Sequence, residues 1–510
     1  MRNRACCRGH QTHNHKLLAS LRDSIVDKPP YISGTLQLPD SFSLFYRVAR
    51  DGNAARFEDG DFFNSPRLLT VVFRCINFAN ATPDELEQLA QTCEAFDGAH
   101  AGKMDSKSFA TTLDPVHTDL MRIVRYYLLE GTQSTKSIEV ELYRLNYYGE
   151  LLIFVHTYLT LYCCPGKGSF FEPHVDTPRS KNMFGSLVIV FPTFHKGGAL
   201  LLRDRYEGGP LSLRHRGPEW IVDLGQALAS GALNGTSIGY VAFFDDIEHD
   251  VAPVTSGHCV TLTYNLYFND DGGVLEKSAI SEHLVFPPKP PNQDGFREAF
   301  NALLENPEFM AEGGTLAFGL RHGYPIKHRH LQDVRNILKG SDAVVYQSAR
   351  ALGFEPTLYM YHNEDCGEHE GLVIDQLVHF DNFLDYDYND EKVDLIRNYI
   401  QTEGGIPVRQ DGGEIHYNDP YTGLDYDDDD RTKPEPIEWV APITTYNRMD
   451  GVYVTNGPSE DETDMHYVYG DACMIVRIGK AGDRLAYLTV AQIEKAHQGT
   501  EHRRKRYFGR

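Results

Sequence analysis

The sequence lacks several features that mark secreted and disulfide-rich proteins. Its nine cysteines are scattered along the chain and include no CxxC pair, so we expect reduced thiols. The basic N-terminal residues are followed by polar residues 11–15, where a signal peptide would need an apolar core. The sequence therefore indicates a cytoplasmic or nuclear protein.

Positive charge and long apolar runs are also scarce. The 49 Lys and Arg residues are outnumbered by 72 Asp and Glu residues, which leaves a net charge of -23. Such acidity argues against a general affinity for nucleic acid or for an anionic membrane. The apolar run Leu151 to Pro165 is shorter than the roughly 20 residues that a bilayer-spanning helix requires. We therefore expect a protein or a small molecule as substrate, with no nucleic acid and no membrane as partner.

The middle of the chain is rich in short stretches of β-branched and aromatic residues separated by turn residues. Strands are expected over 138–148, 184–192, 198–203, 239–245, 249–254 and 259–268, with a short inserted helix over 220–235. This pattern is typical of an antiparallel double-sheet jelly roll. The predicted fold class is therefore mainly β with α, with a double-stranded β-helix (jelly roll) core and flanking helices.

Length and composition predict more than one domain. A chain of 510 residues with 41% hydrophobic residues can bury about two or three cores. The pattern of short β-rich stretches ends near residue 278. The proline-rich residues 287–291 are a linker signal. We predict an N-terminal helical and strand flank over 1–110, the jelly-roll domain over 111–277 and a mixed α/β C-terminal domain over 278–510.

Other elements are expected on both sides of the jelly roll. Thr82 begins a helix to Phe96 with a capping box to Glu85, and Pro115 begins a helix to Leu129 after the cap Asp114. Further helices are expected over 16–26, 295–305, 330–339 and 341–352, and further strands over 68–76, 314–320, 357–361 and 472–478.

Residues Leu151 to Pro165 are an unusual apolar segment between two expected strands. One interpretation is an additional buried strand. The other is that the segment is translated intron or another gene-model error, because its removal would join residues 148–150 to 166–170 through a compact glycine turn. Sequencing the spliced transcript distinguishes the two interpretations.

A histidine and an aspartate separated by one residue occur in three places. His174 and Asp176 lie in an extended stretch, where residues two apart point to the same side and can hold one cation together. His117 and Asp119 fall in the helix expected over 115–129, where residues two apart diverge. The sequence therefore favours His174 and Asp176 as half of a metal site.

His249 is the proposed third ligand of this site. With His174 and Asp176 it forms a two-histidine, one-carboxylate facial triad, which leaves three positions of an octahedral metal open. Non-haem Fe(II) oxygenases use this arrangement to bind oxygen and a chelating cosubstrate. We therefore expect His174, Asp176 and His249 to be both the metal ligands and the catalytic residues.

The ordered series of motifs resembles the Fe(II)/2-oxoglutarate-dependent dioxygenases of the prolyl 4-hydroxylase type, in a fungal-type two-domain form. The matching residues are 174–176, the glycine-led strand 197–200, the run from Phe243 to His249 and the segment 251–264 that follows. The resemblance implies an enzyme that converts 2-oxoglutarate and O2 to succinate and CO2 while it hydroxylates a C–H bond, with a prolyl residue of a protein as substrate. It implies Fe(2+), 2-oxoglutarate and O2 as cofactors, with ascorbate as an additional reductant.

One residue departs from that family's pattern. The family has an arginine or lysine on the strand after the second histidine, where it binds the far carboxylate of 2-oxoglutarate. The corresponding residue here is Cys259, whose thiol cannot make the bidentate, charge-assisted bond of a guanidinium. Arg203, in phase with Ala199 and Leu201, is the expected substitute if its face of the strand points inward. Tyr148 matches an aromatic position that borders the cosubstrate pocket, with core packing as the alternative.

Two other basic residues lie near these motifs. His258 adjoins Cys259 but is expected on the opposite face of the strand, which makes it a poor substitute. Arg179 resembles the basic residue that follows the HxD turn in the family. The resemblance implies that Arg179 lies at the mouth of the pocket.

A second series of similar residues occurs later in the chain. His379, Asp381, His466 and Arg477 repeat the order of the first site. No jelly-roll series of strands is expected between His379 and His466, so a duplicated region that lost its metal explains the repeat equally well. Two other functions also stay open for the chain: a metal-binding pseudo-oxygenase scaffold, and a cupin-like metalloenzyme that does not use 2-oxoglutarate.

Overall fold

The computed structural model describes most of the chain, in segments separated by gaps. The described residues are 18–25, 28–38, 41–48, 72–96, 99–130, 133–134, 136–149, 169–203, 219–225, 228, 236–269, 292–324, 331–363, 370–377, 397–410, 434–441, 452–455, 463–466 and 471–485. The segment Leu151 to Pro165 and the linker 287–291 lie outside them. Among the helices of the described segments, none combines the length and the apolar character needed to cross a bilayer.

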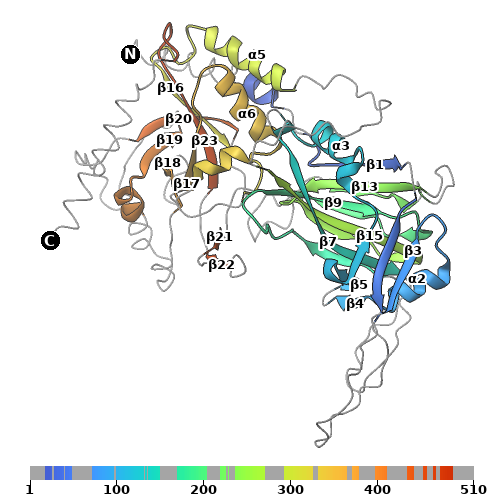
Figure 1. Ribbon diagram of the computed structural model, residues 1–510. Coiled ribbons are helices and arrows are strands. Elements are labelled where there is room, and N and C mark those ends of the chain that lie inside the picture. The colour runs from blue at the N-terminus through green and yellow to red at the C-terminus, as the bar shows by residue number, and fades with distance from the viewer. Residues whose placement is uncertain are drawn as a thin grey trace, which may run out of the picture.

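The first half of the chain is rich in strands (Figure 1). The strands are β1 (Tyr31–Gln37), β2 (Ser43–Val48), β3 (Val72–Asn77), β4 (Glu94–Phe96), β5 (Ala99–Asp105), β6 (Phe109–Thr111), β7 (Ile138–Gly149), β8 (Phe171–His174), β9 (Met183–Val190), β10 (His195–Gly197), β11 (Leu200–Arg203), β12 (Glu219–Val222), β13 (Ser237–Phe244), β14 (Glu248–Val251) and β15 (Val254–Phe268). The helices include α2 (Pro83–Ala90), α3 (Leu120–Tyr127) and the 3-10 turns η1 (Ser106–Ser108) and η2 (Pro115–His117). Residues 18–23, within the helix expected over 16–26, are also helical.

Two antiparallel sheets form the body of this half. The larger sheet has eight strands in the order β1-β13-β9-β15-β7-β5-β4, with β10 also paired to β15. The smaller has four strands in the order β12-β11-β14-β8, and a third sheet, β3-β2-β6, has three. Every residue of β13 is buried, as expected for a central strand that is covered on both faces. The strands expected over 138–268 from alternation and turn residues are thus confirmed.

The N-terminal residues contribute strands to the same large sheet. β1 pairs with β13 along its whole length, and β5 pairs with β7. Figure 1 shows α3 beside β1 and β13 at one edge of this sheet. Residues 1–110 and 111–277 therefore share one layer of backbone hydrogen bonds.

The second half of the chain contains a closed barrel and the helices α5 and α6, and residues 397–402 are also helical. The barrel has the strand order β16-β20-β19-β18-β17-β23, and a separate pair consists of β21 and β22. The bounds are β16 (Gly314–Gly319), β17 (Thr357–Asn363), β18 (Glu370–Ile374), β19 (Ile406–Gln410), β20 (Glu435–Ala441), β21 (Val452–Thr455), β22 (Thr463–His466), β23 (Asp471–Ile478), α5 (Asn292–Glu305), α6 (Gly340–Ala351) and the 3-10 turn η4 (Leu331–Asn336).

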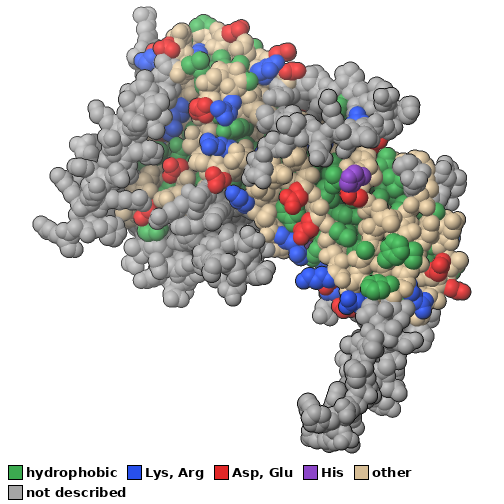
Figure 2. Space-filling view, in the orientation of Figure 1, with side chains coloured by type: hydrophobic (Ala, Val, Ile, Leu, Met, Phe, Trp, Pro, Cys, Tyr) green, Lys and Arg blue, Asp and Glu red, His purple; other side chains and the backbone are tan. Residues whose placement is uncertain are grey.

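The two halves are joined by buried side chains. One hydrophobic cluster runs from Leu187 and Phe244 of the first half to Phe318 and Val345 of the second half. The barrel has its own smaller cluster around Val373 and Ile475. On the face drawn in Figure 2, acidic and basic side chains lie next to one another over both halves. The described chain is thus a mixed, strand-rich molecule with several antiparallel sheets.

Two helices expected in the first half differ in the structure. The helix expected over 115–129 is split into η2 and α3, because the Thr118 hydroxyl donates to the carbonyl of Pro115 and accepts from the N–H of Leu120. The capping box between Thr82 and Glu85 is confirmed, but α2 ends at Ala90. Residues 94–96 pair with β5 instead, so strand pairing prevails over the helical pattern.

Two further expected helices are shorter in the structure. The segment 220–235 begins as strand β12, in which Trp220 and Val222 pair with β11 and alternate with exposed residues. Helix follows the strand, since residues 225 and 228 are helical and the N–H of Leu228 donates to the carbonyl of Leu224 at 3.0 Å. The segment expected as a helix over 330–339 is the short 3-10 turn η4. The backbone of Lys339 is extended, with φ of -112° and ψ of 157°, and a new helix begins only after it.

Candidate metal centre

His174 and His249 lie opposite each other on two neighbouring antiparallel strands. β8 ends at His174, β14 begins one residue before His249, and the two histidines are partners in the register. Side chains of directly opposite residues project from the same face of a sheet. The two imidazole ring centroids are accordingly only 4.1 Å apart.

A backbone carbonyl sets the orientation of each ring. Nδ1 of His174 lies 3.0 Å from the carbonyl oxygen of Glu172, and Nδ1 of His249 lies 3.1 Å from that of Ile247. A carbonyl oxygen can only accept, so each Nδ1 carries the proton and donates. Each Nε2 therefore keeps its lone pair, which is the atom and tautomer that a metal requires.

Asp176 brings a carboxylate to the same place. Its Oδ1 lies 3.9 Å from Nε2 of His249, and its Oδ2 accepts a 2.5 Å hydrogen bond from the hydroxyl of Ser186. Ser186 is buried on β9 of the larger sheet. The hydroxyl therefore fixes one carboxylate oxygen and leaves the other to face the histidines.

The three side chains form a cluster of the right size and chemistry for one metal ion. One ligand atom from each of His174, Asp176 and His249 lies within 4.8 Å of the others. Burial, and next the neighbouring His249, lowers the pKa of His174, which keeps the ring uncharged and able to coordinate. Two imidazoles and one carboxylate suit Fe(II) and other first-row divalent metals.

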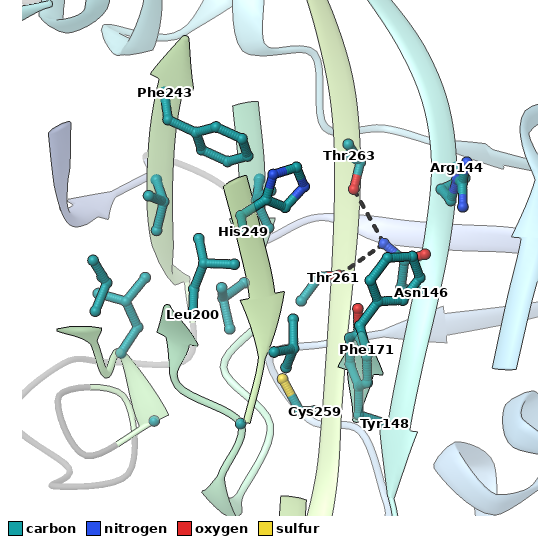
Figure 3. A pocket seen from close by; sticks show the side chains of 18 of the residues that line it. Arg144, Asn146, Tyr148, Phe171, Leu200, Phe243, His249, Cys259, Thr261 and Thr263 are labelled. Atoms are coloured by element: carbon teal, nitrogen blue, oxygen red, sulfur yellow. Dashed lines mark hydrogen bonds between the residues drawn. The ribbon is translucent and has the colours of Figure 1, made fainter. Parts of the chain in front are cut away.

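The cluster opens into a pocket between the two antiparallel sheets (Figure 3). His249 and Phe243 lie at one end of the pocket, and Cys259 and Tyr148 lie at the other. Between them, the amide of Asn146 donates to the hydroxyls of Thr263 and Thr261 at 3.1 Å and 3.5 Å. The walls are otherwise largely apolar, with Phe171, Val188, Val190, Leu200, Val222, Val241 and Val251 among the lining residues.

Cys259 and Tyr148 are cross-strand partners at the end of the pocket away from His249. Burial raises the pKa of the Cys259 thiol to about 12, so the sulfur stays protonated and uncharged. Burial also raises the pKa of the Tyr148 hydroxyl, with a further contribution from Cys259. These two residues therefore present neutral groups to any ligand at this end.

Arg203 lies outside this pocket. Its guanidinium forms ion pairs with Glu219 at 2.6 Å, with Glu248 at 3.6 Å and with Asp250. These carboxylates belong to β12 and β14, the two strands that flank β11. The ion pairs hold the Arg203 side chain on the sheet face opposite to that of Leu200. The face that carries Arg203 therefore points outward.

Arg144 is the arginine that lines the pocket. Its guanidinium carbon lies 4.0 Å from the ring centroid of Tyr143, and the guanidinium carbon of Arg179 lies 4.2 Å from the same centroid. Burial lowers the pKa of Arg144. The ordinary pKa of an arginine is so high that the guanidinium nevertheless stays charged. Its positive charge is one of the influences, after burial and His249, that lower the pKa of His174.

The other histidines of the sequence prediction are placed away from the cluster. His117 is exposed, and its Nδ1 lies 2.7 Å from the carboxylate of Asp114. His258 faces the other side of β15, where its Nδ1 lies 2.5 Å from the Tyr147 hydroxyl. Arg477 lies in the barrel, 3.6 Å from the carboxylate of Glu435. His379 and Asp381 fall outside the described residues, as does the side chain of His466.

Sequence reasoning brought His174, Asp176, His249, Cys259 and Tyr148 to one pocket. It missed Arg144 and Ser186, which belong to no motif. The signal for Arg144 was available: it is four residues before Tyr148 on the same strand, and therefore on the same face. No local signal pointed to Ser186, because its partner Asp176 is brought to it by the tertiary fold.

Comparisons with known proteins found weak similarity among solved structures. No family model matches the chain. No curated protein matches it. Among solved structures, the chain is similar to a prolyl-4-hydroxylase from Pseudomonas putida, with 15% sequence identity and a TM-score of 0.19. The matched region covers 33% of this chain and 70% of that chain. A TM-score this low assigns neither a fold nor a function.

Proposed function

We propose that the chain is a non-haem Fe(II)- and 2-oxoglutarate-dependent dioxygenase that hydroxylates a C–H bond. The observation that carries the proposal is the cluster of His174, Asp176 and His249 at one end of a pocket between two sheets. A facial set of two imidazoles and one carboxylate leaves three coordination positions for a chelating cosubstrate and oxygen. A prolyl residue of a protein is the proposed substrate, on the resemblance of the sequence motifs.

The strand order supports a jelly-roll core for this enzyme. Strands β7, β9, β13 and β15 belong to the larger sheet, whereas β8, β11, β12 and β14 form the smaller one. The chain thus alternates between two facing antiparallel sheets, as it does in a double-stranded β-helix. The pairing of β8 with β14 sets His174 opposite His249, and both line the pocket.

Each part of the pocket has a distinct proposed role. Bound iron supplies the oxidising chemistry, and the protein fixes which of its positions are open. Arg144 attracts the negative charge of the cosubstrate, because a guanidinium in a partly buried pocket binds carboxylates strongly. Phe243 and Leu200 keep water away from the open positions. Cys259 and Tyr148 can each donate one uncharged hydrogen bond at the opposite end.

Spectroscopy under anaerobic conditions tests this proposal. Addition of Fe(II) and then 2-oxoglutarate to the full chain is expected to produce the weak visible charge-transfer band of a chelated cosubstrate. The Asp176→Ala variant should bind neither metal nor cosubstrate in this way and serves as the control. If iron binds without producing the band, the 2-oxoglutarate assignment is wrong and the metal site stands.

Cys259 favours a second candidate from a different class. A neutral, buried thiol at the expected position of the cosubstrate anchor suits a metal-binding scaffold or a cupin-like metalloenzyme that does not use 2-oxoglutarate. The Cys259→Arg substitution separates the two candidates. In a dioxygenase the added guanidinium should raise succinate formation. An unchanged rate would mean that the missing basic residue at position 259 does not limit the binding of 2-oxoglutarate.

A further inference from the structure

The turn that leads into His249 connects the two sheets of the pocket. β13 ends at Phe244 and β14 begins at Glu248, so the turn consists of residues 245–247. The N–H of Ile247 closes it by donating to the carbonyl of Phe244 at 3.2 Å. The carbonyl of Ile247 also accepts from Nδ1 of His249. The position of this turn therefore decides where Nε2 of His249 points.

Lys339 reaches this turn from the second half of the chain. Its side chain is 0% exposed and lies just before α6. Nζ donates to the carboxylates of Asp245 and Asp246, with a distance of 3.2 Å to Asp246, and to the carbonyl of Gly323 at 3.0 Å. An ammonium group has three N–H donors, so all three are used. We refer to Lys339, Asp245 and Asp246 as the clamp.

Asp246 is held by further groups of the second half. Its Oδ2 accepts from the N–H of Gly323 at 2.9 Å and lies 3.1 Å from Nδ1 of His322. Burial acts to raise the pKa of Asp246, but Lys339 and His322 together hold it well below its usual range. Asp246 is therefore an ionised carboxylate whose partners all come from residues 322–339.

The charge of Asp245 is compensated by Lys339. Asp245 is 2% exposed, and its Oδ2 has no hydrogen-bond partner among the described residues. A carboxylate buried in this way is costly unless a cation compensates it. It also lies near enough to the metal ligand Asp176 for the two carboxylates to repel each other. Lys339 therefore offsets a charge that would otherwise push the turn away from the metal centre.

We propose that Lys339 is a positioning residue for the metal centre, and that the second half of the chain holds the β13–β14 turn so that His249 faces the ion. The clamp joins residues separated by 94 positions in the sequence, across the junction of the two halves. Residues that orient metal ligands from outside the coordination sphere typically change metal affinity by about 10- to 100-fold when they are substituted. The inference rests on the metal site of the proposed function and not on the choice of cosubstrate.

Co(II) binding to the full chain tests the clamp, with the d–d spectrum and titration calorimetry as readouts. Lys339→Met keeps the length of the side chain and removes its charge and donors. We expect it to weaken Co(II) affinity by at least about tenfold and to alter the d–d spectrum, because His249 is no longer held in place. Circular dichroism and thermal unfolding measure how much of the variant is folded at the temperature of the titration.

Arg484→Met is the matched control. Arg484 donates to five backbone carbonyls of the second half, which are those of Leu304, Asn306, Phe309, Met310 and Gly479. Its loss should destabilise the same half without touching the turn. The folded Arg484→Met protein should therefore bind Co(II) like the wild type. An equal loss of affinity in both variants would overturn the positioning role, since stability alone would then explain it.

Two further outcomes are decisive. A folded Lys339→Met protein with wild-type affinity and spectrum refutes the clamp while the metal site survives. A wild-type chain that binds no Co(II) refutes the metal site, and the clamp with it. If Lys339→Met does not fold, Asp246→Ala replaces it, because the turn then loses the bonds of Asp246 to Lys339, His322 and Gly323, while Lys339 keeps its bonds to Asp245 and Gly323. That variant is also expected to lose affinity by about tenfold, and an unchanged affinity would reject the proposal.

Discussion

His174, Asp176 and His249 each have one atom committed to a hydrogen bond within the protein. For the two histidines the partner is a backbone carbonyl, which no side-chain substitution removes. For Asp176 the partner is the hydroxyl of Ser186, which a single substitution can remove. The carboxylate is therefore the ligand whose orientation is most easily tested.

Substitution of Ser186 by alanine is expected to weaken metal binding without abolishing it. The lost hydrogen bond frees Asp176 to rotate, and such changes typically cost about 10- to 100-fold in metal affinity. Titration calorimetry with Co(II) measures the effect. Ser237→Ala is the control, because Ser237 is an equally buried serine of the same sheet whose hydroxyl donates to Gln37. Equal affinities of the two variants would contradict the prediction.

Arg144 can be tested against a close neighbour. We expect Arg144→Met to weaken cosubstrate binding by about tenfold or more, because a charge-assisted bond contributes about 1.5–3 kcal/mol. Titration of the anaerobic visible band with 2-oxoglutarate gives the affinity. Arg179→Met is the control, since Arg179 stacks on the same Tyr143 ring without lining the pocket. If both variants weaken binding alike, loss of stacking on Tyr143 is the explanation and Arg144 has no separate role.

The cluster of His174, Asp176 and His249 was the part of the candidate site that the sequence could predict. His174 and Asp176 are two residues apart on an extended segment, so their spacing alone places them together. The placement of Arg203 could not be predicted, because it depends on which face of β11 points inward. That choice is made by Glu219, Glu248 and Asp250, whose carboxylates are brought around the guanidinium by cross-strand pairing.

At the scale of elements, the pairing of β10 with β15 depends on glycine at position 257. Gly257 is the register partner of His195, which lines the pocket. Its φ is +78°, and a Cβ there would lie 2.1 Å from the carbonyl oxygen of Phe194. Both the backbone conformation and the close approach of β10 therefore require glycine.

Gly257→Ala is expected to destabilise the protein by about 1–3 kcal/mol, because a non-glycine residue is strained in this conformation and the backbone of β10 must move. Urea unfolding measures the free energy change. Gly295→Ala in α5 is the opposite case, with no atom within 4 Å of the added Cβ. There the change should stabilise the helix by up to about 1 kcal/mol. A neutral Gly257→Ala would mean that β10 is not held by this contact.

Strands were predicted more accurately than helices. Alternating residues over 138–148 gave β7, and the β-rich residues 259–268 gave the second part of β15, where most side chains are buried. Residues 94–96 and 220–222 were expected as helix, but each pairs with a neighbouring strand. Such pairing depends on partners distant in sequence, which a local pattern cannot reveal.

At the scale of the whole molecule, the partly buried His362 makes stability depend on pH. Burial lowers the pKa of His362 to about 4, below its ordinary value of 6.5. Below pH 6.5 the unfolded chain therefore binds a proton that the folded chain does not, so stability falls as the pH is lowered from 6.5 to about 4. The full shift corresponds to at most about 3 kcal/mol, and partial exposure of the residue makes it smaller.

His362→Gln should remove this component. Urea unfolding of both proteins at several values between pH 4 and pH 7 gives the difference in stability, and other titrating groups cancel in that difference. The variant should lose less stability than the wild type on acidification. Parallel curves for the two proteins would show that His362 does not contribute.

The clamp also bears on the time during synthesis at which the metal site can form. Synthesis delivers Asp245 and Asp246 well before Lys339 and His322, which are the groups that compensate their charge. Until the ribosome has passed residue 339, the nascent first half must either leave the β13–β14 turn exposed to solvent or bury two carboxylates without a cation. We therefore expect a ribosome-stalled chain that ends before residue 339 to present its three ligands loosely, so that metal loading follows translation of the second half.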